Sequence, residues 1–354
     1  MPKPLVIVES PAKARTIAGF LGRDFQVESS VGHIRDLPSK GLSIDVDDHF
    51  TPTYEVHASK KDVIRRLKAA LKEADELYLA TDEDREGEAI SWHLLQVLKP
   101  KVPVKRMVFH EITPSAIDHA VQNWREIDEG LVDAQETRRI VDRLWGYPVS
   151  EVLWRKVGGG LSSGRVQTPA VRLVVERERE RIAFVAADYW DLAALFATDP
   201  GFEATLVSVD GRRLATGKDF DDRGQLTRDV IVLDEAGAVG LRAALDGAAF
   251  AVRSVEEKPY TSKPKAPFMT STLQQEGGRK LRMSSRQVMS VAQSLYQNGY
   301  ITYMRTDSTT LSETALTAAR AQVVQLYGRE YLPDAPRTYD RKVKNAQEAH
   351  EAIR

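Results

Sequence analysis

The sequence contains no cysteine. This absence excludes disulfide bonds and any cysteine-bound zinc or iron-sulfur site within the chain, and it is typical of a reducing compartment. The seven histidines show no spacing typical of metal ligands. The sequence therefore predicts no zinc, and a metal ion of another kind would have to be held by oxygen or histidine.

Two further patterns are missing. No run of about 18 apolar residues occurs, and no charged-then-apolar leader stands at the N-terminus, so the sequence predicts a chain that does not enter a membrane. The motif GxxxxGK[ST] is also absent, which argues against a P-loop nucleotide site and against the use of ATP. We expect a cytoplasmic protein.

Charge is balanced overall, because 50 Lys and Arg stand against 51 Asp and Glu, but it is unevenly distributed. Residues 1–134 carry 18 basic against 23 acidic residues and residues 183–257 carry 7 against 14, whereas residues 135–182 carry 10 against 6 and residues 258–354 carry 15 against 8. Two basic segments suit binding of a phosphate backbone, although a solvated surface explains them equally well.

The length of 354 residues allows two to four domains, since single cores stop growing at about 250 to 300 residues. In the first 130 residues apolar runs alternate with helical patterns, which is typical of an α/β fold with a mostly parallel sheet. The expected elements are strands at 5–9 and 77–80 and helices opened by Ser10, by a capping box of Ser59 with Asp62, and at 88.

The middle of the chain changes character twice. Residues 131–182 have helical periodicity broken by glycines at 158–160, and residues 188–257 show short alternating runs typical of β-structure, with a turn at Asp210 and Gly211. A connector rich in Pro and Lys follows at 259–268.

Two helices are predicted near the C-terminus. Ser284 with Gln287 forms a capping box for the first, which ends at Asn298 and Gly299, and Thr310 with Glu313 opens the second. The stretch between them, GYITYMRTDSTTLS, places two phenols beside Arg305, hydroxyl groups and a carboxylate. Residue types alone do not decide whether either phenol reacts.

Five carboxylates crowd the stretch DEDREGE at residues 82–88, directly after a predicted strand. Like charges repel, so the cluster needs a cation or a bound proton. In an extended segment Asp82, Asp84 and Glu86 would project to one side and could hold Mg²⁺. The alternative is an acidic first turn of the following helix, which the helix dipole favours.

Two other stretches point to phosphate chemistry. Glu9 ends the first strand, so it is expected to meet the acidic cluster at the carboxyl edge of the sheet, with Lys13 in the next helix near a phosphate. The stretch GGGLSSGRVQ offers backbone donors and Arg165 at a helix start. A capping Glu, a surface Lys and an ordinary glycine-rich loop are the simpler explanations.

Several motifs occur together in a fixed order. They are LVIVESPAKA, VGHIRDLP, LATDEDREGEAISWHL, FHEIT, DAQETRRIVDRLWGY, LSSGRVQTPAVRLVVERE, PFMTSTLQQE, YITYMRTDSTTLS and NAQEAHEAIR. In this combination they resemble the type IA DNA topoisomerases, especially those of bacteria. The resemblance covers essentially the whole chain.

The resemblance implies a multidomain fold that combines α/β, helical and β-rich parts. Its four segments would be a Toprim α/β domain with the acidic Mg²⁺ site at 1–130, a helical single-strand DNA-binding segment at 131–184, a β-rich arch segment at 185–258 and a helical domain carrying the nucleophilic tyrosine at 259–354. The helical DNA-binding domains would have helix-turn-helix character. The arch would lift the tyrosine domain to open a gate for a second strand.

The resemblance also assigns roles. Tyr303 would be the nucleophile, with Tyr300 left as a packing residue, and Arg305 would support the scissile phosphate. Glu9 and Lys13 would serve proton transfer and transition-state stabilisation. Asp82 and Asp84, with Glu86, would hold Mg²⁺. The residues expected along the DNA strand are His33, Arg138, Arg139, Arg143, Arg165, Gln167, Gln293, Thr302, Asp307 and His350.

The implied enzyme is an isomerase that breaks and rejoins one DNA strand through a 5′-phosphotyrosyl intermediate, with Mg²⁺ and without ATP. A phenol has a pKa of about 10, so it needs a proton acceptor or nearby positive charge before it attacks. The partner would be single-stranded segments of negatively supercoiled DNA, which the enzyme relaxes. We expect a monomer associated with the nucleoid.

The motifs end at Arg354, inside one that the family continues, so we expect an N-terminal fragment with incomplete strand passage. Two alternatives remain open. A Toprim-type nuclease would use the same carboxylates with water, and a DNA-binding fragment would bind strands without cutting them.

Overall fold

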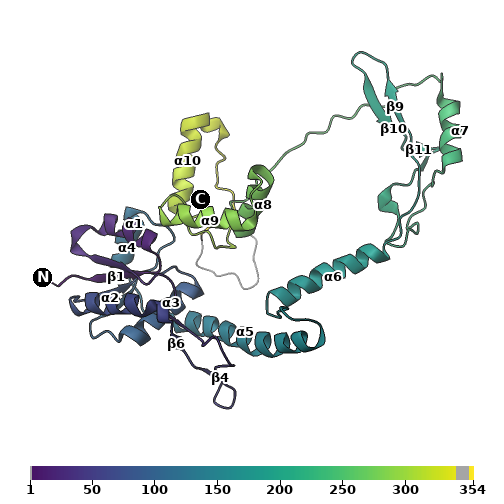
Figure 1. The fold of residues 1–354 in the computed structure, drawn as a ribbon. Coiled ribbons are helices and arrows are strands. Elements are labelled where there is room, and N and C mark those ends of the chain that lie inside the picture. The colour runs from purple at the N-terminus through teal and green to yellow at the C-terminus, as the bar shows by residue number, and fades with distance from the viewer. Residues whose placement is uncertain (1, 340–350) are drawn as a thin grey trace. The chain divides into compact units, whose positions relative to one another are not determined.

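The computed structural model describes residues 2–339 and 351–354. The chain divides into two compact units, one formed by Met1–Val152 together with Lys263–Arg354 and the other by Leu153–Ser262 (Figure 1). The first and last parts of the sequence therefore share one unit. No helix in the described ranges is long and apolar enough to cross a bilayer.

A four-stranded parallel sheet forms the centre of the first unit, in the order β2-β1-β7-β8. Its strands are β1 (Leu5–Val8), β2 (Gln26–Ser29), β7 (Leu77–Leu79) and β8 (Val104–Arg106). Two small antiparallel pairs accompany it, β3 (Arg35–Asp36) with β6 (Glu55–Val56) and β4 (Ile44–Asp45) with β5 (Thr51–Pro52). The parallel sheet predicted for this part is confirmed.

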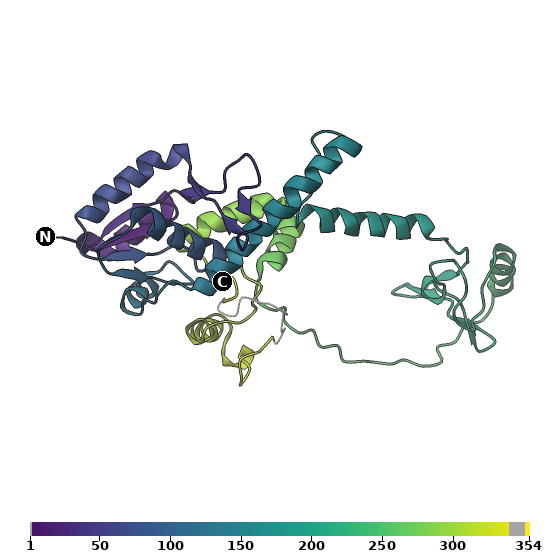
Figure 2. The same ribbon diagram turned by 90° about the horizontal axis from the view of Figure 1, so that it is seen from below.

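Helices cover both faces of the sheet (Figures 1 and 2). Side chains alternate along a strand, so Val6 and Val8 pack on one face and Leu5 and Ile7 on the other. The first face carries α1 (Pro11–Leu21) and α4 (Pro114–Gln122), and the second carries α2 (Lys61–Lys72) and α3 (Arg85–Leu98). The core on the first face also includes Tyr303.

The C-terminal part of this unit is helical. Its helices are α8 (Thr270–Leu281), α9 (Ser285–Gln297) and α10 (Glu313–Tyr327), and the long α5 (Glu129–Lys156) runs from the first unit into the second. Helix α9 ends at Asn298 and Gly299 as predicted. The stretch that carries Tyr303 is therefore the connector between α9 and α10.

Three predicted helix starts were wrong. Ser59 does not cap α2, because it lies in a 3₁₀ turn at Ala58–Lys60 and Asp62 pairs instead with Arg65 at 2.5 Å. Helix α3 begins at Arg85 rather than 88. Helix α10 is capped by Ser312, whose Oγ accepts from the Ala315 N–H, while Thr310 binds the C-terminal segment.

The second unit contains α6 (Gln167–Ala183) and α7 (Glu235–Leu245) besides two short antiparallel pairs. The pairs are β9 (Ala193–Phe196) with β10 (Phe202–Thr205) and β11 (Ser208–Val209) with β12 (Arg212–Arg213). The predicted turn at Asp210 and Gly211 joins β11 to β12, and both residues have positive φ. Helix α7, capped by Asp234, was not foreseen in this segment.

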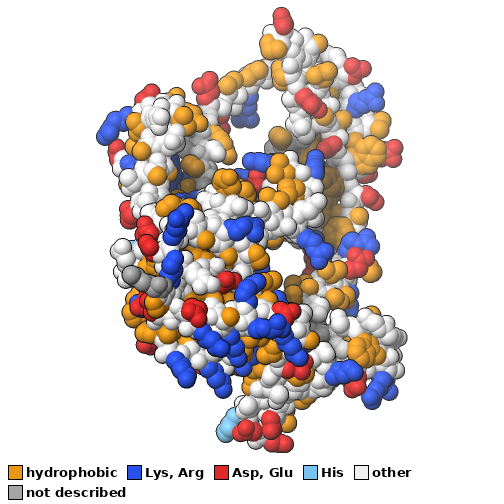
Figure 3. All heavy atoms as spheres, turned by 60° about the vertical axis from the view of Figure 1, so that its left-hand side comes forward, with side chains coloured by type: hydrophobic (Ala, Val, Ile, Leu, Met, Phe, Trp, Pro, Cys, Tyr) orange, Lys and Arg blue, Asp and Glu red, His pale blue; other side chains and the backbone are white. Residues whose placement is uncertain are grey.

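The net charge of a sequence segment does not predict the charge of the surface that the segment forms. Helix α2 lies in the acidic N-terminal segment, yet it exposes Lys61, Arg65, Arg66, Lys68 and Lys72 to solvent. On the face drawn in Figure 3, Lys and Arg side chains gather low in the view. Basic surface therefore also occurs outside the two segments that the sequence marked as basic.

The capping box of α9 offers a first prediction. Ser284 Oγ accepts from the Gln287 N–H at 3.3 Å, and Gln287 Oε1 accepts from the Ser284 N–H at 2.8 Å. We expect Ser284→Ala to lower the free energy of unfolding by about 1 kcal/mol, because it exposes unpaired N–H groups. Urea unfolding measures this. Ser290→Ala, in the exposed middle of α9, should be neutral or slightly stabilising, so equal losses in both variants would contradict the cap.

Candidate active site

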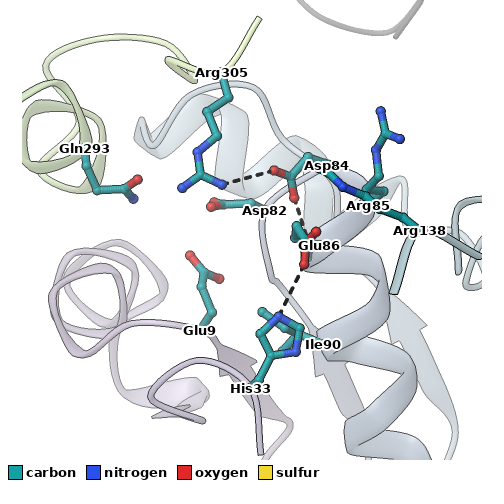
Figure 4. Close-up of a pocket in the computed structure, with 11 residues that line it drawn as sticks. Glu9, His33, Asp82, Asp84, Arg85, Glu86, Ile90, Arg138, Gln293 and Arg305 are labelled. Carbon is teal, nitrogen blue, oxygen red and sulfur yellow. Dashed lines mark hydrogen bonds and ion pairs between the residues drawn. The ribbon is translucent and has the colours of Figure 1, made fainter. Parts of the chain in front are cut away.

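A cavity of about 610 Å³ opens at the carboxyl edge of the sheet (Figure 4). Glu9 follows β1 and Asp82 follows β7, so adjacent parallel strands deliver both carboxylates to one side. The other charged or polar residues that line it are His33, Asp84, Arg85, Glu86, Arg138, Gln293 and Arg305. Ligands of open α/β sheets bind at this edge, and the predicted meeting of Glu9 with the acidic cluster is confirmed.

The acidic segment has a different geometry from the one predicted. Asp84 is the N-cap of α3, and its Oδ1 accepts from the Gly87 N–H at 2.9 Å. Glu86 therefore lies in the first helical turn, and the expected extended alternation of Asp82, Asp84 and Glu86 was wrong. Figure 4 shows the three carboxylates at separate points around the cavity.

Gly87 allows this tight turn. A Cβ atom at Gly87 would lie 2.1 Å from the backbone oxygen of Asp82, so a side chain would push the acidic segment out of place. We expect Gly87→Ala to lower the free energy of unfolding by about 1 to 3 kcal/mol, measured by urea unfolding. At Gly19, in α1, an added Cβ meets nothing within 4 Å. Gly19→Ala should instead stabilise by up to about 1 kcal/mol, and a comparable loss there would count against the contact at Gly87.

The protein itself supplies polar partners for the carboxylates that line the cavity. Lys13 is fully buried, and its Nζ lies 3.0 Å from Asp82 Oδ1 and 3.3 Å from the Glu9 carboxylate. Asp84 lies 3.8 Å from the Arg305 guanidinium, and Glu86 lies 3.5 Å from Nε2 of His33. The four carboxylates that line the cavity are therefore bound by three partners, Lys13, Arg305 and His33. The other two acidic residues of the stretch DEDREGE pair elsewhere, Glu83 with His110 and Glu88 with Arg106 and Arg125.

Lys13 is set apart from the cavity surface. Its ammonium lies 4.7 Å from the centre of the Phe109 ring, beneath the carboxylates that it binds. The sequence suggested that Lys13 meets a phosphate. From its buried position such a contact would require Lys13 to leave Glu9 and Asp82.

The carboxyl of Glu9 is tuned by its surroundings. Burial raises the pKa of Glu9 to about 7, while Lys13 acts to lower the pKa and Asp82 to raise it. For Glu86, the hydrogen bond with His33 holds the pKa below its usual range. Glu9 can thus carry a proton near neutrality, as a group that donates a proton to a leaving oxygen must.

The Tyr303 phenol is buried and hydrogen-bonded. Only 2% of Tyr303 is exposed, and its hydroxyl donates to Asp84 Oδ2 at 2.6 Å. Burial raises the pKa of Tyr303 well above its usual range, and the charges of Asp82 and Asp84 raise it further. The phenol is therefore neutral here, and Asp84 is placed to take its proton.

Tyr300 behaves differently from the prediction. It is 75% exposed, so the expectation that it packs in the core was wrong. The chain turns at Gly299, whose φ is +78° and whose Cβ would lie 2.4 Å from the Ile112 oxygen. After this turn Thr302, Tyr303 and Met304 are buried, while Tyr300 points to solvent.

The structure gathers some of the predicted DNA-contact residues and leaves others elsewhere. His33, Arg138 and Gln293 line the cavity. Asp307 lines an adjacent cavity of about 290 Å³. Thr302 is turned away, because its Oγ1 donates to the Ala352 oxygen at 2.8 Å.

The other residues predicted to contact DNA either bind other parts of the protein or belong to the second unit. Arg139 pairs with Asp36, with Nε 2.8 Å from Oδ1, and Arg143 donates to the oxygens of Pro38 and Gly41. Arg165 lies two residues before α6, in the unit Leu153–Ser262, and Gln167 is the first residue of that helix. His350 lies outside the described residues.

Sequence reasoning missed one group that shapes the site. Arg106 is fully buried, and its guanidinium donates to the backbone oxygens of Thr81 at 2.9 Å and Asp82 at 2.7 Å and to Glu88 at 3.0 Å. It thereby holds the end of β7 from which the acidic segment starts. Arg106 is the last residue of β8, and a lone arginine there gave no signal of this role, because arginine is normally exposed.

The donors suit a hard cation. Carboxylate oxygens from Glu9, Asp82, Asp84 and Glu86 surround the cavity, and Mg²⁺ prefers such ligands together with water. Within residues 2–339 and 351–354, no three acidic or histidine side chains stand close enough together to form a metal site. The residues fit Mg²⁺ by chemistry, with Glu9 and Asp82 sharing Lys13 and with Asp84 and Glu86 bound by Arg305 and His33.

Comparisons with known proteins give a consistent result. A family model described as DNA topoisomerase matches residues 126–354, and one described as Toprim domain matches residues 4–112. The DNA topoisomerase 1 of Streptomyces coelicolor is 63% identical across 99% of this chain and 39% of that protein. The DNA topoisomerase 1 of Mycobacterium tuberculosis (strain ATCC 25618 / H37Rv) is 58% identical across 99% of this chain and 40% of its own length.

A solved structure agrees with these relatives. Full-length topoisomerase I from Thermotoga maritima matches with a TM-score of 0.77 and 37% sequence identity, over 99% of this chain and 55% of that one. The chain spans about two fifths of the length of the curated relatives it matches.

Proposed function

The chain belongs to the type IA DNA topoisomerase family, and from this membership we propose that its cavity breaks and rejoins one strand of DNA through Tyr303. The hydrogen bond between the Tyr303 hydroxyl and Asp84, at the wall of the acidic cavity, is the observation that carries the proposal. It joins a nucleophile to a proton acceptor in a site that is lined mainly by acidic and basic groups.

In the first step Asp84 accepts the phenol proton while the Tyr303 oxygen attacks the scissile phosphorus. A bond forms between this oxygen and phosphorus, and the bond from phosphorus to the 3′-oxygen breaks. The 2.6 Å hydrogen bond supports this role, because a neutral phenol needs a base within reach. The products are a 5′-phosphotyrosyl bond and a strand end that leaves as a 3′-hydroxyl.

Two other side chains complete the step. Glu9, with its pKa raised to about 7, donates a proton to the leaving 3′-oxygen and takes it back when the strand is rejoined. Arg305 is 57% exposed and faces the cavity, so its guanidinium can stabilise negative charge on the phosphate. Lys13 binds both Glu9 and Asp82 and so holds the two carboxylates in position.

Asp82 and Asp84, with Glu86, would hold Mg²⁺, which supplies charge neutralisation and orientation of the phosphate for rejoining. The phosphodiester bond energy is kept in the phosphotyrosyl bond, so rejoining needs no ATP. Relaxation of negatively supercoiled DNA is the net reaction that such breakage would serve.

The expected partner is a single-stranded segment of DNA, with His33, Arg138 and Gln293 as contacts in the cavity. We assign residues 1–130 to the Toprim domain and residues 259–354 to the domain of the nucleophile. Residues 131–184 and 185–258 are assigned to the helical DNA-binding segment and the arch segment. A monomer at the nucleoid remains our expectation.

A covalent-capture experiment tests the proposal. The chain is incubated with a single-stranded oligonucleotide that carries a label at its 3′ end, and the mixture is denatured and separated by electrophoresis. We expect a labelled band at the size of the protein, because the downstream fragment stays on Tyr303. Adding Mg²⁺ and a second strand with a free 3′-hydroxyl should convert this band to a rejoined oligonucleotide.

The two alternative functions would give different bands in this electrophoresis. A Toprim-type nuclease would release a labelled fragment with no protein attached, and a DNA-binding fragment would leave the oligonucleotide intact. Either result would overturn the proposed function.

A further inference from the structure

Three cavities follow one another along the segment that carries the nucleophile. Arg85 and Arg305 line both the active-site cavity and the adjacent cavity of about 290 Å³. Met269, the residue before α8, lines both this second cavity and a third of about 750 Å³. The shared walls make a continuous path from Asp84 to the face of α8 that carries Glu276.

The third cavity carries a surplus of positive charge. Glu276 stands at its wall and is surrounded by Arg279 at 2.7 Å, Lys280 at 3.2 Å and Lys265 at 3.8 Å. Among the described residues that line this cavity, Glu276 is the sole acid. Three cations around one carboxylate leave a net charge of +2, and each cationic side chain is more than half exposed, so all three can also face an incoming phosphate.

The same cavity offers flat apolar surface. Phe268 is 39% exposed, and Tyr339 and Pro267 also contribute to the wall. Grooves for single-stranded nucleic acid combine cations that follow the backbone with aromatic rings on which bases stack. The third cavity contains both components, whereas a site for a small anion would need no exposed ring.

The third cavity is tied to the nucleophile segment. The Thr270 N–H donates to the Thr306 oxygen at 2.9 Å, and Thr270 Oγ1 donates to the Met304 oxygen at 2.8 Å. Helix α8 is thus bonded to the residues on either side of Arg305. A strand end that is covalently attached to Tyr303 would keep its position relative to this cavity.

We propose that the third cavity binds the phosphates of the strand segment that lies 3′ of the scissile phosphate, the segment that stays attached to Tyr303. The inference rests on the proposed function, which makes this segment the covalently bound one. The second cavity, lined by Arg85, Arg305 and Asp307, would carry the strand between the two ends of the path.

The test compares two oligonucleotides with the same cleavage site and upstream sequence, one with about two and one with about ten nucleotides downstream. Affinity is measured by fluorescence anisotropy on the Tyr303→Phe variant, in which no cleavage competes. We expect the longer oligonucleotide to bind about tenfold more tightly. In a chain that also carries Lys265→Ala and Lys280→Ala, this advantage should fall to less than about twofold. The slope of the logarithm of the binding constant against the logarithm of the salt concentration should become shallower by about 1.4 for the longer oligonucleotide, because two phosphate contacts are lost.

Two matched variants sharpen the result. Lys68→Ala with Lys72→Ala removes two exposed cations from the outer face of α2 and should leave the length advantage unchanged. Glu276→Gln removes the negative charge from the third cavity, so the longer oligonucleotide should bind about threefold more tightly and the shorter one equally well.

An undiminished length advantage in the Lys265→Ala, Lys280→Ala chain would overturn the inference, as would an equal loss in the α2 variant. These outcomes are distinguishable from failure of the proposed function. That function is tested by the covalent band, which the parent chain must give with both the short and the long oligonucleotide.

Discussion

Tyr303→Phe is expected to abolish the covalent adduct completely, at any time of incubation and any enzyme concentration. The variant keeps the ring that packs edge-on against Tyr296 at 5.1 Å and loses the hydroxyl that donates to Asp84. Without this oxygen no bond to phosphorus can form. Denaturing electrophoresis with a 3′-labelled oligonucleotide measures the loss, and binding of the uncut strand should change by less than about twofold.

Tyr300→Phe is the matched control, because Tyr300 lies three residues away and is 75% exposed. We expect its adduct yield to equal that of the parent chain. Strand cleavage that survives in Tyr303→Phe would identify a water nucleophile and a nuclease. Adduct formation that disappears in Tyr300→Phe would move the chemistry to the exposed phenol.

The choice between these two tyrosines illustrates what the sequence could and could not predict. Both stand in one connector with the same neighbours, and the residue types alone left the choice open. The resemblance to a family favoured Tyr303. In the structure the difference is physical, because Tyr303 lies within the core of the first unit and Tyr300 lies in solvent.

The capping box of α9 was predictable, because it depends on two residues three positions apart. The parallel sheet was predictable only as a class, from the alternation of apolar runs with helical patterns. The start of α3 was not. Within DEDREGE any of several acidic residues could cap a helix, and Asp84 does so because Gly87 fits against the Asp82 backbone. That contact follows from the folded turn and has no periodic signal.

The pairing of charged side chains in the site could not be predicted from the sequence either. Lys13 and Asp82 are 69 positions apart and meet because β1 and β7 are neighbours in the sheet. Sequence reasoning looked for a metal ion to offset the acidic cluster. Strand order brings a lysine to the same place, and that order could not be deduced from residue patterns.

Lys13→Met is expected to cause the largest loss of stability. The substitution keeps most of the side-chain volume and removes the ammonium that lies 3.0 Å from Asp82 and 3.3 Å from Glu9. Breaking a buried ion pair on one side leaves an uncompensated charge and typically costs about 3 to 5 kcal/mol. Urea unfolding at pH 8 measures it, and Lys72→Met, at the exposed end of α2, should change stability by less than about 0.5 kcal/mol.

The destabilisation caused by Lys13→Met should be larger at high pH than at low pH. In the folded chain the pKa of Glu9 is about 7, above its ordinary value of 4.5, so its contribution to stability is fully present below pH 4.5 and is lost as the pH rises through 7. Lys13 acts to lower this pKa, and its removal raises it further. At pH 5 Glu9 is protonated in the folded state of both chains. The substitution then removes only the ion pair between Lys13 and Asp82. We therefore expect a smaller destabilisation at pH 5 than at pH 8.

A double variant separates the two carboxylates. Glu9→Gln removes the charge that Lys13→Met leaves unpaired, so the pair of substitutions together should cost less at pH 8 than the sum of the two single losses. At pH 5 the coupling should shrink, because the Glu9 carboxyl is then already neutral. Equal losses for Lys13→Met at both pH values, together with strict additivity at pH 8, would mean that Lys13 acts through packing on Phe109 rather than through charge.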